Sequence, residues 1–274
     1  PVTRKKRKAR VTRKRRPSAA ALAAAARAKA AATVKVAEEI GEPTNAYLEQ
    51  PGALVPFFEQ LYRQENHLQP GPVRVLQFGD SHTAAHYWTS AIRDALQSRF
   101  GNGGSGFIHA GKPWVGYKRF DVTTAASPGW SSEGLVGKPS QRGDEFQGLG
   151  GVSVHTARPG AWITLETSTS ALEVQYLRQP GGGSFRLYDN EELVAEQSTD
   201  GELGPGILQF STTEGMHVFK IVTTSSAPVK LYGWVSEEPL GVTYEPLGIS
   251  GANASISARW NLPLFQHFLA RRDP

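Results

Sequence analysis

The sequence predicts an α/β fold in which a parallel sheet is interrupted by an antiparallel β-sandwich or jelly roll. Residues 73–100 have the pattern of a short apolar strand, a glycine turn and a helix, and residues 242–270 repeat this pattern. Between them, short runs of alternating polarity follow one another at roughly ten-residue spacing, which is typical of antiparallel sheets. Such strands do not belong in the middle of a doubly wound fold, so we interpret them as an inserted domain.

The first α/β segment places one serine on a sharp turn. Val73–Phe78 is rich in β-branched residues, which predicts a buried parallel strand, and Gly79 frees the backbone to turn. Apolar residues then recur at three- and four-residue spacing through Thr83–Phe100, as in an amphipathic helix. Ser81 therefore lies near a helix N-terminus, where a developing negative charge is favoured, and is our candidate nucleophile. The alternative is that Asp80 and Ser81 only cap the helix.

The middle of the chain carries the signal for the β-insert. Alternating runs are separated by clusters of turn-forming residues. The runs are 162–166, 171–177, 184–188, 206–210, 217–222 and 229–235. Aromatic residues here could stack on sugar rings, although aromatic residues in strands more often belong to the core. The residues concerned are Trp114, Tyr117, Trp130, Trp162, Tyr176 and Trp234.

The last segment returns to the α/β style. Val242–Ala254 predicts a strand followed by a glycine loop, and residues 255–270 carry a helical pattern. Gly251 lies in the loop, where the missing Cβ lets the backbone approach a ligand closely. The alternative is an ordinary turn glycine.

A further helix is expected within residues 46–70.

Two motifs resemble a known family. Gly79-Asp80-Ser81 after a strand resembles the first block of the SGNH (GDSL-type) hydrolases, and Ile249-Ser250-Gly251-Ala252-Asn253 resembles their second. The inserted β-domain is similar to that of the peptidoglycan O-acetylesterases of this superfamily, whose insert resembles a carbohydrate-binding jelly roll. The resemblance implies a three-layer, flavodoxin-like α/β domain, with Ser81 as nucleophile and the N–H groups of Ser81 and Gly251 as the oxyanion hole.

Two other blocks of that family are not found in these residues. One supplies an Asn to the oxyanion hole after a further strand, and the other is an Asp-x-x-His whose histidine is the general base. We expect a longer enzyme or another chain to complete the site, because a serine without a base keeps its proton at neutral pH. Neither His82 nor His86 is expected to be the base. Their spacing would suit a zinc pair, but no third ligand is evident, so we expect no metal.

Charge is distributed unevenly along the chain. Ten of the 30 basic residues lie in the first 16 positions, which hold no acid, so the other 20 basic and 25 acidic residues give a net charge of −5. We interpret the basic run and the alanine-rich stretch after it as a disordered tether, or a processed leader, over residues 1–45. This tail could bind an anionic membrane surface or nucleic acid. The alanine-rich stretch is too short and too polar to span a bilayer, and no signal peptide is visible.

Together these features predict a serine esterase of the SGNH type. It would hydrolyse O-acetyl or other acyl esters on a carbohydrate polymer such as peptidoglycan, in the periplasm or cell envelope by family resemblance. We expect a partial hydrolase-like domain at 46–111 and 239–274, and the β-sandwich insert at 112–238. The chain has no cysteine, which excludes disulfides and thiol nucleophiles, and no cofactor is expected. The alternative is a non-catalytic glycan-binding or scaffold protein with a vestigial hydrolase domain.

Overall fold

The computed structural model describes most of the chain after residue 50. The described residues are 51–68, 71–136 and 143–274, together with helical positions 19, 20, 23, 26, 27, 30 and 31. The basic run and most of the predicted tether at 1–45 lie outside the described residues. No helix in the described ranges is long and apolar enough to cross a membrane.

The chain forms two compact units, Pro1–Gln60 and Leu61–Pro274. The 3-10 helix η1 (Pro51–Leu54) and the first part of α2 (Val55–Glu65) belong to the first unit, which confirms a helix within residues 46–70.

A pair of parallel strands holds the two predicted α/β segments together. β1 (Val73–Gly79) pairs with β13 (Val242–Gly248) in parallel, residue for residue from Val73↔Val242 to Gly79↔Gly248. The predicted parallel strand is confirmed, but the expected burial is wrong for most of β1: Phe78 is exposed, because β1 is an edge of a two-stranded sheet. The three-layer parallel sheet therefore stays a prediction.

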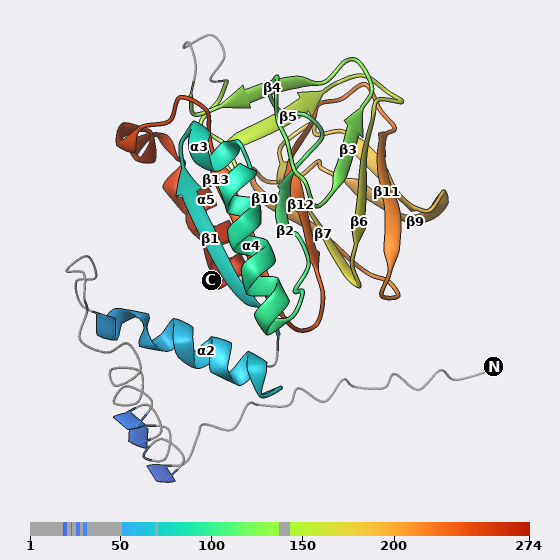
Figure 1. Cartoon of the computed structure of the whole chain (residues 1–274). Coiled ribbons are helices and arrows are strands. Elements are labelled where there is room, and N and C mark those ends of the chain that lie inside the picture. Colours follow the sequence, from blue (N-terminus) through green and yellow to red (C-terminus); the bar gives the residue numbers. More distant parts are fainter. Residues whose placement is uncertain are drawn as a thin grey trace. The chain divides into compact units, whose positions relative to one another are not determined.

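Two antiparallel sheets lie in sequence between β1 and β13. The first contains β2 (Gly106–His109), β4 (Ser131–Gly134), β5 (Val152–Thr156), β7 (Ala171–Arg178), β10 (Gly204–Ser211) and β12 (Val229–Glu237). The second contains β3 (Thr123–Ala126), β6 (Trp162–Ser168), β8 (Ser184–Asp189), β9 (Glu192–Ser198) and β11 (Met216–Thr223). Their orders are β10-β7-β12-β5-β4, with β2 paired to β12, and β3-β6-β11-β8-β9. Every predicted alternating run is a strand, and the two sheets fill the right side of Figure 1.

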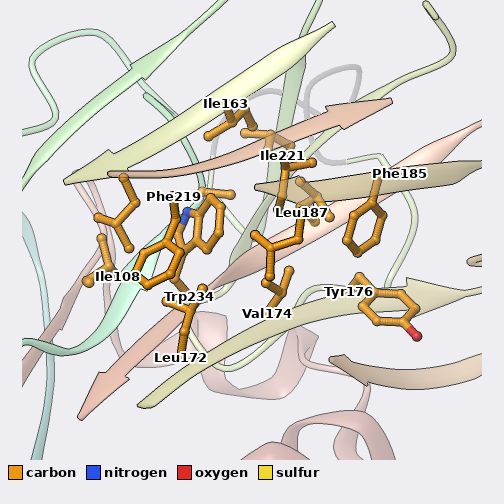
Figure 2. Close-up of a cluster of buried hydrophobic side chains, with 14 of the residues drawn as sticks. Ile108, Ile163, Leu172, Val174, Tyr176, Phe185, Leu187, Phe219, Ile221 and Trp234 are labelled. Carbon is orange, nitrogen blue, oxygen red and sulfur yellow. The ribbon is translucent and has the colours of Figure 1, made fainter. Parts of the chain in front are cut away.

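The two sheets enclose one apolar core, as in a β-sandwich. Figure 2 shows side chains from both sheets meeting there, among them Trp234 of β12 and Phe219 of β11. Tyr176 of the first sheet and Phe185 of the second are in edge-to-face contact, with ring centroids 5.6 Å apart. Burial of these side chains is the main force that joins the sheets.

Strand β2 lies on the α/β side of the predicted boundary between residues 111 and 112. It hydrogen-bonds antiparallel to β12, from Gly106↔Ser236 to His109↔Gly233, and so extends the antiparallel sheet. The predicted domain limits themselves stay a prediction. Five strands lie outside the predicted runs: β2, β3, β4, β5 and β9. The residues of β3 and β4, Thr-Thr-Ala-Ala and Ser-Ser-Glu-Gly, carry no apolar alternation that could predict a strand.

The helix predicted over Thr83–Phe100 is broken in two. α3 (Ser81–Ala84) ends before His86, whose backbone is left-handed (φ +65°), and α4 (Tyr87–Phe100) begins after it. The predicted apolar face of α4 is also wrong, since its buried residues are Thr89 and Arg93 whereas Tyr87, Trp88 and Ile92 are exposed. Buried charge pairing by Arg93, rather than apolar periodicity, decides which face of α4 packs inward.

The C-terminal helical pattern is likewise interrupted. η3 (Ala254–Arg259) is followed by α5 (Leu262–Arg272), whose Asn261 side chain caps Leu264 N–H. α5 packs on the outer side of the first antiparallel sheet, where Phe268 meets Tyr232 edge-to-face at 5.4 Å.

Candidate functional site

The two motif-bearing loops meet at one end of the parallel pair. Both follow the carboxyl ends of their strands, and Ile249 N–H donates to the Gly79 carbonyl oxygen at 3.0 Å, so the pairing continues past both strand ends. In open α/β sheets, ligands bind outside these carboxyl ends. The paired residues Gly79 and Gly248 are about 170 positions apart in the sequence. The loops that follow them therefore lie at the same edge of the sheet, where a ligand site is expected.

Two glycines let α3 lie directly on the strand ends. A Cβ on Gly248 would come within 2.2 Å of the Ala84 backbone nitrogen and 2.7 Å of the Asp80 carbonyl oxygen. A Cβ on Gly79 would come within 2.1 Å of the hydroxyl of Thr83, which is buried. Both positions need glycine for close approach, and they fix where α3 presents its first residue.

That first residue is Ser81, and its side chain is exposed. Asp80 is the N-cap: its carboxylate accepts the His82 N–H at 2.9 Å, and this hydrogen bond holds the pKa of Asp80 below its usual value. Within the described part of the chain, the Ser81 hydroxyl and N–H have no hydrogen-bond partner. Asp80 thus caps the helix, while the hydroxyl and N–H of exposed Ser81 are left without a partner among the described residues.

Gly251 occupies a turn that requires its conformation. Ala252 N–H donates to the Ile249 carbonyl oxygen at 2.9 Å, which closes a four-residue turn, and Gly251 has φ +81°. That value is typical of the third position of a type II turn. Among the described residues, no acceptor faces the Gly251 N–H. The nearest atom to a Cβ there would be Val136 Cγ1 at 3.3 Å.

A cleft of about 510 Å³ opens between the two loops. Its lining residues are Phe78, Gly79, Asp80, His82, Thr83, Trp88, Leu247, Ile249, Ala252, Asn253, Ala254, Ile256, Ser257 and Trp260. They flank both predicted site residues, with Asp80 and His82 on either side of Ser81 and Ala252 directly after Gly251. Ser81 and Gly251 themselves are not among the lining residues.

Neither nearby histidine contacts the Ser81 hydroxyl. The exposed His82 ring lies with Nδ1 3.3 Å from Asp80 Oδ1. His86 is buried, and its Nδ1 accepts the Phe120 N–H at 3.1 Å. Burial, reinforced by nearby Arg119, lowers the pKa of His86 to about 3, so the ring is neutral. The described residues thus place no general base beside Ser81.

The antiparallel insert supports the loop that follows β13 and contains Gly251. The sequence alone does not predict this support. Arg259 donates to the Leu135 carbonyl oxygen at 3.0 Å, and Trp260 Nε1 donates to the Gly148 carbonyl oxygen at 3.2 Å. Trp260 also packs edge-to-face on Phe78 of β1, at a centroid distance of 6.1 Å. Trp260 therefore connects the insert to the apolar wall of the cleft.

The aromatic residues singled out in the sequence are mainly core residues. Trp234 and Tyr176 are buried between the sheets, and Trp130 donates its indole N–H to the Trp162 carbonyl oxygen. Three aromatic residues line the cleft: Phe78 belongs to the predicted strand, whereas Trp88 and Trp260 belong to segments predicted as helical. No group of three or more metal-binding side chains is found among the described residues.

Comparisons with known proteins support the fold. No protein-family model and no curated protein matches the chain. A solved structure described as "Peptidoglycan O-acetylesterase in action, 5 min" is similar at 24% identity and a TM-score of 0.58, over 76% of this chain and 55% of that one. This chain thus spans about half the length of that protein.

Weaker likenesses involve parts of the chain. A two-domain esterase active on acetylated mannans is 12% identical over 51% of this chain and 38% of its own, with a TM-score of 0.35. A family 35 carbohydrate-binding module from an environmental isolate is 12% identical over 44% of this chain and 97% of its own, with a TM-score of 0.30. Such scores are too low to support any inference.

Proposed function

We propose that this chain carries the nucleophile and part of the oxyanion hole of an SGNH-type serine esterase. Its substrates would be O-acetyl or other acyl esters on a carbohydrate polymer such as peptidoglycan. The observation that carries the proposal is the convergence of the Ser81 turn and the Gly251 turn at the ends of adjacent parallel strands, around one cleft. The fold-level similarity to a peptidoglycan O-acetylesterase supports the choice of substrate.

In this proposal the Ser81 hydroxyl oxygen attacks the carbonyl carbon of the ester. The negative charge that develops on the carbonyl oxygen is stabilised by the N–H groups of Ser81 and Gly251, which have no other acceptor in the described structure. Such a donor contributes about 3–4 kcal/mol to transition-state stabilisation. Collapse of the tetrahedral intermediate releases the sugar hydroxyl and leaves an acyl-serine, which water then hydrolyses.

The reaction needs a base to take the Ser81 proton, and the described residues place none there. We therefore expect slow hydrolysis by this chain, which a soluble base should accelerate. Acetate released from O-acetylated peptidoglycan is measured with and without added imidazole. We expect imidazole to accelerate release by the unmodified chain and to leave Ser81→Ala at the rate of imidazole alone. The matched control is Ser98→Ala on α4, an exposed serine outside the cleft. Equal acceleration of Ser81→Ala would contradict the proposal.

That no base lies beside Ser81 among the described residues also favours a second candidate, a glycan-binding or scaffold protein with a vestigial hydrolase site. This candidate predicts sedimentation with the polysaccharide but no Ser81-dependent acetate release at any imidazole concentration. The same experiment therefore separates the two functions.

The domain organisation and location remain part of the proposal. The partial hydrolase-like domain would comprise residues 46–111 and 239–274, with the insert at 112–238. The protein would act in the periplasm or cell envelope, where such a polymer lies.

A further inference from the structure

An exposed aromatic pair at the N-terminal end of α4 takes no part in the proposed reaction. Tyr87, the first residue of α4, is 63% exposed, and Phe120, which precedes β3, is 53% exposed. Their ring centroids are 5.4 Å apart and their planes are at 64°. Trp88, the next residue of α4, lines the cleft. Tyr87 is therefore the direct sequence neighbour of a cleft-lining residue, at the N-terminal end of α4.

Phe120 is held on the surface by charged neighbours that turn inward. Arg119 donates to the Phe107 carbonyl oxygen at 2.8 Å and to Asp121 at 2.6 Å, and its side chain is buried. Asp121 also pairs with the buried Arg93 of α4 at 3.0 Å. Because both neighbours are anchored in the interior, the ring between them has a fixed outward position.

His86 fixes the pair from beneath. The Phe120 N–H donates to His86 Nδ1, and the Phe120 ring packs edge-to-face on the imidazole at 5.3 Å. The left-handed backbone of His86 also starts α4 at Tyr87. A ligand that covers the two rings would find them already ordered, which lowers the entropic cost of binding.

Lys118 adds a polar rim to this apolar surface. Its ammonium group donates to the Tyr87 hydroxyl at 3.3 Å and lies 5.6 Å from the Tyr87 ring centroid. A pyranose ring has the complementary combination, an apolar face of C–H groups and a rim of hydroxyls. The negative face of an aromatic ring attracts the weakly positive C–H groups, while ammonium and phenol groups can hydrogen-bond to the hydroxyls.

We propose that Tyr87 and Phe120 form a stacking subsite for a pyranose ring of the polysaccharide whose ester enters the cleft. The chain of sugars would pass from the cleft, along Trp88, onto the pair. The choice of polymer rests on the proposed function, but the inference concerns binding and does not require a reactive Ser81.

The test measures binding of the whole chain to peptidoglycan sacculi from which O-acetyl groups have been removed with mild alkali. Co-sedimentation gives the affinity, and chitohexaose is titrated as a soluble probe. Tyr87→Ala should weaken binding about tenfold, which corresponds to the upper range of an aromatic contact, and Tyr87→Phe should stay within about twofold. The matched control is Tyr62→Ala in α2, where the tyrosine is 61% exposed. We expect this control to bind as the unmodified chain does.

Three outcomes would overturn the subsite: no binding by the unmodified chain, equal binding by Tyr87→Ala, or equal weakening by Tyr62→Ala. A change of oligomeric mass on Tyr87→Ala would also overturn it, because the pair would then be an interface between copies. Imidazole-dependent acetate release, measured on the same variants with a small acetate ester, reports the proposed function separately. Failure of the stacking subsite can therefore be distinguished from failure of the proposed esterase function.

Discussion

Acidification to pH 5.5 should destabilise the fold through two buried histidines. His86 is buried against the Phe120 ring and accepts the Phe120 N–H. His109 of β2 is enclosed by the rings of Phe107, Trp114 and Tyr117. Both His109 ring nitrogens lack a hydrogen-bond partner among the described residues. Burial, with Arg119 nearby, lowers the pKa of each histidine from 6.5 to about 3. Both are therefore neutral in the folded protein from pH 8 down to well below 5.

The sign and size follow from proton linkage. In the unfolded chain the histidines titrate near pH 6.5, so below that pH the unfolded state binds protons that the folded state does not, and stability falls as the pH falls. One unit below 6.5, this loss is about 1.4 kcal/mol per histidine, or about 3 kcal/mol for the two at pH 5.5 relative to pH 8. Unfolded carboxylates titrate mostly below this window, so they contribute little to the loss.

Urea unfolding at pH 8 and pH 5.5, followed by tryptophan fluorescence, gives the two free energies of unfolding. His109→Phe keeps an aromatic ring in the cage and removes one titrating group, so its loss between the two pH values should be about half that of the unmodified chain. Equal stability at the two pH values, or greater stability at pH 5.5, would refute the assignment of buried neutral histidines.

Two further predictions concern packing at the site and behind it. Gly248→Ala should lower the free energy of unfolding by about 1–3 kcal/mol or more, because its Cβ meets the α3 backbone at 2.2 Å. Gly251→Ala, whose new Cβ would meet only Val136 Cγ1 at 3.3 Å, should cost about 1–2 kcal/mol for a left-handed alanine. The reverse order in urea unfolding would contradict the described packing. Arg272→Met should cost about 3–5 kcal/mol, since it leaves Glu245, which is fully buried, without its charge partner. The exposed pair Arg186–Glu196 is the control, and Arg186→Met should not change the urea midpoint measurably.

The strand-and-turn features of the site could be predicted because they are local. Val73–Gly79 and the turn at Ser81 follow from β-branched residues, a glycine and an N-cap aspartate that are contiguous in the sequence. The strands of the sandwich likewise follow from alternation within each run. Gly251 could be placed in a turn for the same reason, although the resemblance and not the spacing suggested its role.

The remaining features depend on contacts between distant residues. The break at His86 is stabilised by Phe120, and Arg93 is buried because Asp121 meets it, so no periodicity along α4 could show either. Support of the second loop by Leu135 and Gly148 joins positions more than 100 residues from Arg259 and Trp260. Apolar periodicity assumes that the apolar face of a helix is the buried one. It therefore predicts a buried Tyr87, whereas the side chain is exposed.

The central claim is that Ser81 is the nucleophile, and covalent labelling tests it most directly. The whole chain is treated with a serine-directed phosphonate in the presence of imidazole, and the adduct is located by peptide mass spectrometry. We predict a single adduct on Ser81, at a rate that Ser98→Ala leaves unchanged. An unlabelled Ser81, or an adduct distributed over several exposed serines, would contradict the claim.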